Sequence, residues 1–242
     1  VMSLRPSEAQ QAESCAYAVV LREKSTPTTS GAASFGKAFA ACVSGDAEAT
    51  RKALVHLSAA QADELLHLVE TYQETMPVPA GAMDEWAFAL NRSGGLCPWD
   101  DPDRATRGYI DHWWQEEGFY VVRDDKTGDR PVTHPADNLQ LAPYLLAAGQ
   151  VASFGAKPVG EVANPKIGRL VRYMYQPGEV EALWERFLRA EAKSQAVPVL
   201  AEPGGHCAEC YQRMQCDVRL LPAMKNIETA MEPFMAEAAG LS

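Results

Sequence analysis

The chain has no hydrophobic run approaching the roughly 18 residues that a membrane-spanning helix requires. Its N-terminal segment is polar and lacks the apolar centre of a secretory signal peptide. Positive charge is also scarce, since 22 Lys and Arg residues against 32 Asp and Glu residues give a formal net charge of −10. These absences predict a cytoplasmic protein without a membrane partner. They argue against loose, charge-driven nucleic-acid binding, although they do not exclude a local basic groove.

The six cysteines lack the second Cys-x-x-Cys that a zinc ribbon usually shows. Without a secretory signal, metal ligation is favoured over a disulfide framework. Three of the cysteines, Cys207, Cys210 and Cys216, lie within ten residues of one another after a Gly-Gly turn. A complete thiolate site normally takes four ligands, and this triple with one remote cysteine fits a [4Fe–4S] cluster better than zinc. A zinc site and three free buried thiols are the alternatives.

Hydrophobic residues make up 47% of the 242 residues, which is enough for a normal core in one large domain or two small ones. Apolar periodicity and capping residues predict helices at residues 5–24, 33–43, 46–57, 58–72, 137–151, 178–192 and 222–238. Strands are predicted at residues 85–90, 107–114, 119–122, 158–164 and 169–175. This order is typical of an α/β domain with a central mixed β-sheet flanked by helices.

The most informative stretch is Gly118-Phe-Tyr-Val-Val-Arg-Asp-Asp-Lys-Thr-Gly128, which reads as a strand that runs into a tight turn. Side chains alternate between the two faces of a strand. Asp124 and Lys126 should therefore point to one face, and Asp125 to the other.

A hairpin loop at Glu117-Gly118 would connect this strand to the one before it. That loop pairs Glu116 with Phe119, and the same register puts Asp111 opposite Asp124. Directly opposed residues share a face, with Cβ atoms about 4.5–5.5 Å apart. Two carboxylates this close repel each other unless a cation lies between them.

Two facing carboxylates, Asp111 and Asp124, offer hard oxygen ligands to Mg²⁺ or Mn²⁺. The ammonium group of Lys126 can orient an attacking water, lower its pKa or stabilise charge that develops on a phosphate. The competing interpretation is an ordinary solvated hairpin, because an Asp-x-Lys triplet is common.

The segment Gln140-Leu-Ala-Pro-Tyr144 places Gln140 and Tyr144 four residues apart, on one face of the predicted helix. Both side chains can donate hydrogen bonds to a phosphate or to the carboxylates. An ordinary helix with a polar edge would look the same. Asp137 is the expected N-cap of this helix, and Pro143 inside it should bend or locally open it.

These motifs follow one another as Gly108-Tyr-Ile-Asp111, Val121 to Gly128, Gln140-x-x-x-Tyr144 and Cys-x2-Cys-x5-Cys. In this order they resemble the RecB-like branch of the PD-(D/E)xK nucleases, over about residues 7–216. The iron–sulfur members, such as Cas4, the AddB nuclease domain and related phage exonucleases, are the most similar group.

The resemblance implies a metal-dependent DNA nuclease, an exonuclease on single-stranded DNA, with a restriction-endonuclease-like core and a structural [4Fe–4S] cluster. It implies one domain over residues 1–242, with a helical part at 1–80, a catalytic core at 81–195 and a cluster-binding tail at 196–242. DNA is the implied partner. A homo-oligomer, or partner proteins from recombination, CRISPR or phage systems, are further expectations.

Family roles can be carried onto this chain residue by residue. Asp111 and Asp124 match the metal-binding acids, Lys126 matches the catalytic lysine, and Gln140 and Tyr144 match the downstream helical motif. The first cluster cysteine of the family lies in a helix near the N-terminus, a place that Cys15 matches. Cys42 and Cys97 are the rival fourth ligands.

One position departs from the resemblance. The family often has a histidine that closes a Gly-x-x-x-His motif, but the matching stretch here, Gly36-Lys-Ala-Phe-Ala40, ends in an alanine that cannot bind metal. The departure leaves open whether one or two metals bind, and it favours a non-catalytic, metal-stapled interaction module as the alternative function. Glu85 is a candidate extra carboxylate, with a plain surface role as the competing interpretation.

Overall fold

A computed structural model describes residues 3–24, 31–129, 132–196, 199, 201–208, 210, 212 and 216. Within them, five strands form one sheet in the order β1-β2-β3-β4-β5. The strands are β1 (Met83–Asn91), β2 (Arg104–Glu116), β3 (Phe119–Asp125), β4 (Lys157–Asn164) and β5 (Arg169–Met174). Only β3 and β4 run parallel to each other, and the other neighbours are antiparallel. The sheet is therefore mixed, as the sequence predicts.

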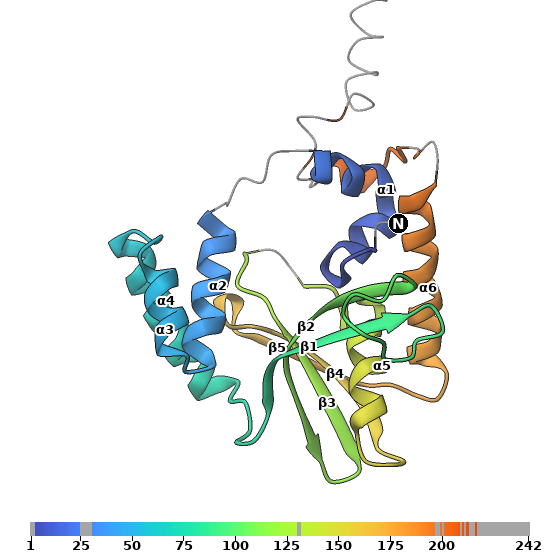
Figure 1. The fold of residues 1–242 in the computed structure, drawn as a ribbon. Helices are drawn as coiled ribbons and strands as arrows, with labels where there is room; N and C mark the ends of the chain where they lie inside the picture. Colours follow the sequence, from blue (N-terminus) through green and yellow to red (C-terminus); the bar gives the residue numbers. More distant parts are fainter. Residues whose placement is uncertain are drawn as a thin grey trace, which may run out of the picture.

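Helices cover both faces of the sheet (Figure 1). On one side lie α2 (Gly31–Val43), α3 (Ala47–Leu54) and α4 (Ala59–Thr75), and on the other lie α5 (Leu141–Val151) and α6 (Glu179–Gln195). α1 (Ala9–Lys24) packs alongside α6. Short 3-10 turns occupy residues 6–8, 135–137, 165–167 and 205–208. The architecture fits a restriction-endonuclease-like core, and the predicted last helix at 222–238 lies outside the described residues.

Two hydrophobic clusters hold these layers together. The larger cluster joins the sheet to α5, α6 and α1. It includes Ile110, Val122, Leu145 and Phe187, which are completely buried. α5 is apolar on nearly all sides and its residues are correspondingly buried. The smaller cluster joins α2 to α4 around Phe39 and Tyr72. The larger cluster thus packs α5, α6 and α1 against the sheet, and the smaller one meets the sheet at Ala163 of β4.

Two of the predicted helix starts are correct. The carboxylate of Asp46 accepts hydrogen bonds from the backbone N–H groups of Glu48 and Ala49 at the start of α3. Ser58 and Gln61 form a capping box at the start of α4. In each case a side-chain oxygen satisfies backbone donors that have no partner within the helix.

The predicted start of α5 is wrong. Asp137 belongs to a separate 3-10 turn, and the helix begins at Leu141 with Gln140 in the N-cap position. Pro143 is therefore the third helical residue. The first turn of a helix has no internal acceptors for its N–H groups, so a proline there costs no hydrogen bond and produces no bend. The difference matters because Gln140 lies at the N-terminal end of α5 and not in the interior of the helix.

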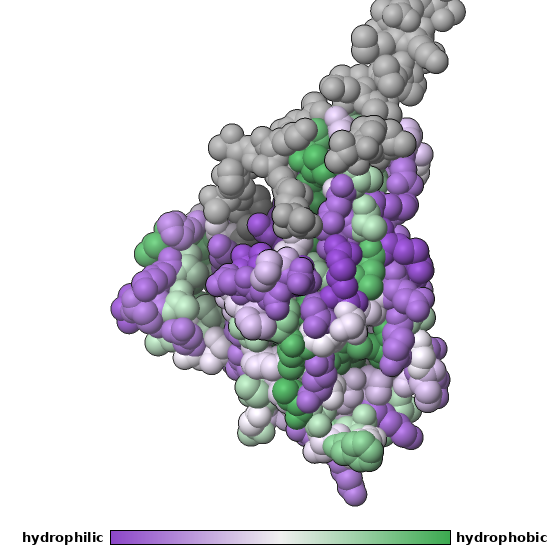
Figure 2. Space-filling model, turned by 45° about the vertical axis from the view of Figure 1, so that its right-hand side comes forward, coloured by the Kyte–Doolittle hydropathy of each residue, from purple (hydrophilic) through white to green (hydrophobic). Residues whose placement is uncertain are grey.

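The surface facing the viewer in Figure 2 is predominantly hydrophilic, with hydrophobic residues in narrow stripes and small groups. Among the described residues, no helix combines the length and the apolar character needed to cross a bilayer.

Candidate active site

Asp111 and Asp124 lie across the β2–β3 ribbon in the predicted register. Glu116 pairs with Phe119, and the ladder continues in register as far as His112 opposite Arg123. Asp111 and Asp124 are the residues that follow this last pair on the two strands. The backbone N–H of Asp125 donates to Oδ2 of Asp111 at 2.7 Å. Asp124 is 1% exposed. A rigid strand pair thus holds one carboxylate of each strand at the same level of the sheet.

Lys126, Asp124 and Gln140 form a closed ring of polar contacts. The Nζ of Lys126 lies 2.6 Å from Oδ2 of Asp124 and donates to Oε1 of Gln140 at 2.8 Å. The amide nitrogen of Gln140 donates to Oδ1 of Asp124 at 2.7 Å and to the hydroxyl of Tyr144 at 2.9 Å. The N-cap position aims Gln140 at the strand ends, so the sequence-predicted residues from β2, β3 and α5 converge on one point.

Burial and mutual repulsion set the charges of this group. Burial, together with the nearby carboxylates of Asp124 and Asp125, raises the pKa of Asp111 well above its usual range. Burial also raises the pKa of Asp124, although the Lys126 ammonium opposes this. Burial lowers the pKa of Lys126, but the surrounding carboxylates outweigh burial, and the net effect is upward. Lys126 therefore stays a cation beside these carboxylates.

A pocket of about 430 Å³ opens beside the carboxylates, between the strand ends and α2. Asp111 lines it together with Glu85, Asp125 and Ala40. The position that the resemblance assigns to a histidine thus lies on the pocket wall, where alanine supplies no ligand. Glu85 is exposed, lines the same pocket and has a left-handed backbone with φ of 48°. Such a conformation is uncommon for a residue with a Cβ and tends to occur at functional sites.

A comparison with protein families matches the PD-(D/E)XK nuclease superfamily over residues 4–217. The chain belongs to this superfamily. Two solved structures are also similar to the nuclease. A candidate exonuclease from Eubacterium rectale is 10% identical with a TM-score of 0.48, and the match covers 80% of this chain and 83% of that one. The structure of SSO0001 is 15% identical with a TM-score of 0.37, and covers 87% and 96%. Comparison with the curated proteins gives no match.

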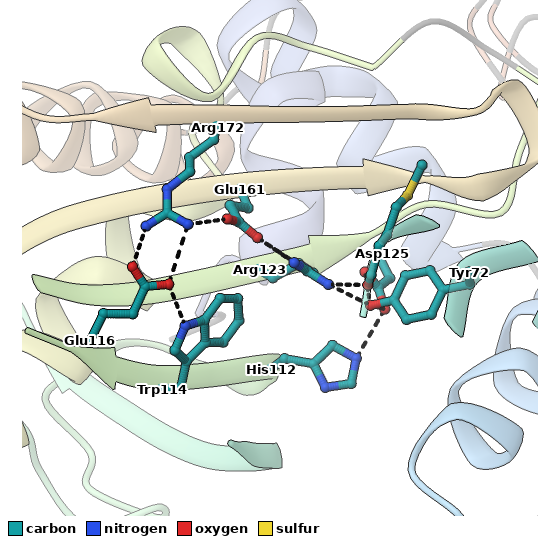
Figure 3. A network of polar contacts seen from close by, with 9 residues as sticks. Tyr72, His112, Trp114, Glu116, Arg123, Asp125, Glu161 and Arg172 are labelled. Atoms are coloured by element: carbon teal, nitrogen blue, oxygen red, sulfur yellow. Dashed lines mark hydrogen bonds and ion pairs between the residues drawn. The ribbon is translucent and has the colours of Figure 1, made fainter. Parts of the chain in front are cut away.

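The opposite face of β3 in this nuclease carries a second polar network that the sequence did not indicate (Figure 3). The hydroxyl of Tyr72, on α4, donates to both carboxylate oxygens of Asp125 at 3.0 and 2.9 Å. The Nε2 of His112 lies 3.0 Å from Asp125, and its Nδ1 lies 2.6 Å from Asp84. Asp125 points away from Lys126, as strand alternation predicts. These contacts fix the strand end that carries Asp124.

Arg123 extends this network into the sheet. It forms an ion pair with the buried Glu161 at 2.7 Å and donates to the hydroxyl of Tyr72 at 3.2 Å and to the carbonyl of Met76 at 2.7 Å. Arg172 joins Glu161 to Glu116 at the far end (Figure 3). A buried pair of this kind needs all its hydrogen bonds to offset the loss of hydration. The network connects α4 to β3 and β4, and its members Asp84, His112 and Asp125 also line the 430 Å³ pocket.

The predicted cluster cysteines come together at the other end of the nuclease. Cys15, Cys207, Cys210 and Cys216 all line one small pocket of about 20 Å³. α1 is interrupted at Cys15, where φ of −161° and ψ of 97° are not helical. The rival ligands lie elsewhere, since Cys42 packs in the α2–α4 cluster and Cys97 follows β1 with its N–H bonded to the carbonyl of Ala89. Of the three candidates for the fourth position, Cys15 alone is among the described residues that line this pocket.

Within the residues that the structure describes, no three His, Cys, Asp or Glu side chains are grouped closely enough to bind a metal as they stand. The donor types nevertheless fit: two hard carboxylates at one point, and four thiols around another.

Replacing Asp111 with asparagine should stabilise the metal-free nuclease while abolishing cleavage. The raised pKa of Asp111 means that the folded state binds more protons than the unfolded state above the usual carboxyl pKa of about 3.8. The free energy of unfolding therefore falls as the pH rises from about 3.8 to the pKa of Asp111 in the folded state. Asparagine removes this loss and still accepts the Asp125 N–H.

At neutral pH in EDTA, we expect Asp111→Asn to melt about 2–4 °C above the wild type, corresponding to about 1 kcal/mol. The difference should shrink as pH approaches 4. Asp103→Asn, at an exposed loop position, is the control and should melt like the wild type. An Asp111→Asn protein that melts at a lower temperature than the wild type at every pH would show that the ionised carboxylate of Asp111 does not destabilise the folded state.

Proposed function

We propose that this chain is a Mg²⁺- or Mn²⁺-dependent deoxyribonuclease, an exonuclease that acts on single-stranded DNA. The observation that carries the proposal is the convergence of Asp111, Asp124, Lys126 and Gln140 at the end of the β2–β3 ribbon. Carboxylates that share one point with an ammonium group suit phosphodiester hydrolysis, in which negative charge builds up on a phosphate next to a cation.

In this proposal Asp111 and Asp124 hold the cation, which supplies Lewis acidity to the scissile phosphate when bound. Lys126 remains protonated, and its side chain is 36% exposed, so its ammonium can donate to a non-bridging oxygen as charge develops there. Gln140 keeps Lys126 and Asp124 in fixed positions by bonding both. Tyr144 fixes the amide of Gln140, and burial holds the pKa of its hydroxyl well above the usual range, so it stays protonated.

The second part of the proposal is a structural [4Fe–4S] cluster held by Cys15, Cys207, Cys210 and Cys216. The shared pocket of the four thiols supports it. The backbone N–H of Gly204 donates to the sulfur of Cys207 at 3.4 Å. A protein prepared without oxygen should be brown, should absorb at about 400 nm and should contain about four iron atoms per chain. A colourless preparation that contains one zinc per chain would show that the four thiols bind zinc and not an iron–sulfur cluster.

The test of the nuclease proposal uses a single-stranded oligonucleotide labelled at either its 5′ or its 3′ end, with Mn²⁺ or Mg²⁺. An exonuclease releases short labelled products at once from one label and a ladder of shortening products from the other. The same label on a duplex should be released more slowly. Products that begin in the middle of the strand would indicate an endonuclease. No cleavage under either metal would favour the alternative below.

The alternative is a non-catalytic interaction module in DNA recombination or phage replication, in which the metal site only stabilises the fold. Ala40 favours it, because the wall position that the family often fills with a histidine supplies no ligand for a cation. This observation leads to a prediction for the enzyme: Ala40→His should lower the Mn²⁺ concentration for half-maximal cleavage by about tenfold, since an imidazole on the wall adds a ligand beside Asp111.

The matched control is Ala47→His, at an exposed position of α3 that does not line the pocket. It should leave the Mn²⁺ dependence at the wild-type value. Equal Mn²⁺ dependence in Ala40→His and Ala47→His would mean that the cation binds away from this wall.

A further inference from the structure

The catalytic pocket does not end at the carboxylates. A second hollow, of about 420 Å³, lies against α2 and α3 and shares Lys37, Ala41 and Ala49 with the first. Because they share these residues, the two hollows adjoin along α2 and α3, and together they form a groove that extends from Asp111 past Lys37 to Lys52 and His56. The groove therefore leads from the site of chemistry across the outer helices.

The wall of this groove is made largely of small side chains: Ala40, Ala41, Ala49 and Ala53 line it. Alanines leave room for a chain to lie close to the helix surface, where longer side chains would hold it off. Ser34 adds a hydroxyl group that can donate to a phosphate oxygen, whereas the hydroxyl of Ser44 donates to the carbonyl of Ala41 at 3.1 Å. The wall thus offers space and hydrogen bonds, without a large apolar surface.

The charges of the groove differ from end to end. Carboxylates crowd the end beside the strands, where Asp84, Glu85, Asp111 and Asp125 lie. The helical end carries Lys37 and Lys52, and the N-cap residue Asp46 is the one carboxylate of the described residues that lines the first hollow from this side. Among the described residues, Lys37 has no carboxylate within ion-pair distance, whereas Lys52 pairs with Glu48 at 3.2 Å and is 75% exposed. In a chain with net charge −10, an unpaired lysine on the rim of the candidate active site is available to an anionic ligand.

We propose that this groove carries the sugar–phosphate backbone of the DNA strand next to the cleaved bond, and that Lys37 binds the phosphate adjacent to the scissile one. Lys52 binds a phosphate further along the strand. This inference rests on the proposed function and specifies the path of its substrate. It also explains how an acidic protein holds DNA: the basic contacts are few and lie along one groove.

The test measures DNA binding without cleavage. Fluorescence anisotropy with a labelled oligothymidine in EDTA gives the Kd at several salt concentrations. For Lys37→Ala we expect a Kd about five- to tenfold higher, and a salt slope smaller by about 0.7, the value for one phosphate contact on a single strand. Lys37→Glu should weaken binding further, and Lys37→Arg should retain most of it. Lys52→Ala should have a smaller effect in the same direction.

The matched controls are Arg51→Ala, on α3 but outside both hollows, and Lys157→Ala, an exposed lysine at the start of β4. Both should bind like the wild type. In cleavage assays Lys37→Ala should raise KM and leave kcat nearly unchanged, because Lys37 does not touch the reacting atoms.

The outcomes separate this inference from the proposed function. If Lys37→Ala binds like Lys157→Ala while the wild type cleaves DNA, the nuclease stands and the groove assignment is wrong. If the wild type binds the oligonucleotide through Lys37 but never cleaves it, the groove stands and the catalytic proposal is wrong. A wild-type protein that binds no oligonucleotide overturns the groove assignment outright.

Discussion

Lys126→Ala should reduce the rate of DNA cleavage by about 10³-fold or more, the scale of losing a preorganised charge at a reacting phosphate. The ammonium lies 2.6 Å from Asp124 and 2.8 Å from Gln140, so its position is fixed before any substrate binds. Alanine removes the charge and also leaves the buried Asp124 without its cation. The measurement is kcat on a labelled single-stranded oligonucleotide with saturating Mn²⁺.

Lys157→Ala is the control, because Lys157 is exposed and lies outside the catalytic pocket. Lys126→Arg tests geometry rather than charge. A planar guanidinium cannot take the place of a compact ammonium between Asp124 and Gln140, so arginine should not restore the rate. Full activity in Lys126→Ala would remove this residue from the mechanism, provided that circular dichroism shows both variants to be folded.

Cys207→Ser should lower the melting temperature by about 6–12 °C, corresponding to at least about 3 kcal/mol. The proposed cluster would form only in the folded chain, so its binding energy would contribute to stability. Hydrogen exchange should show where the loss occurs. The segment at residues 201–208 should lose its protection, whereas α1 should keep most of its own.

This difference follows from a second attachment of α1. Arg186 on α6 forms two hydrogen bonds to the carboxylate of Glu13, at 2.9 and 3.0 Å, and Val19 is buried against the same core as Phe187. α1 is therefore held without the cluster. Cys42→Ser, outside the thiol pocket, is the control and should not remove iron. Unchanged stability in Cys207→Ser would mean that no cluster or metal is bound there.

Local rules were sufficient to predict the centre of the site. Strand alternation separates Asp124 and Lys126 from Asp125, and the turn at Glu117-Gly118 fixes the pairing of Glu116 with Phe119. Both depend only on neighbouring residues, and both are confirmed. The pairing of Gln140 with Tyr144 also depends on a short spacing, and their hydrogen bond of 2.9 Å agrees with it.

Contacts between distant segments could not be predicted in the same way. Tyr72 lies 53 residues before Asp125, and nothing in the spacing indicates that its hydroxyl binds that carboxylate. The Asp137 cap was wrong for a related reason. Pro135-Ala136-Asp137 can start either a helix or a separate turn, and the local sequence does not show that Leu139 and Leu141 beyond it are both buried in the core. The groove past Lys37 likewise exists only once α2 and α3 pack beside the strand ends.

The central claim is that Asp111 and Asp124 together hold one catalytic cation. A crystal soaked in Mn²⁺ tests it most directly, because the anomalous signal locates manganese without reference to the protein atoms. We predict a manganese peak within about 2.5 Å of one oxygen from each carboxylate, and no such peak in Asp124→Asn. Manganese bound elsewhere, with these two carboxylates left without a cation, would contradict the account.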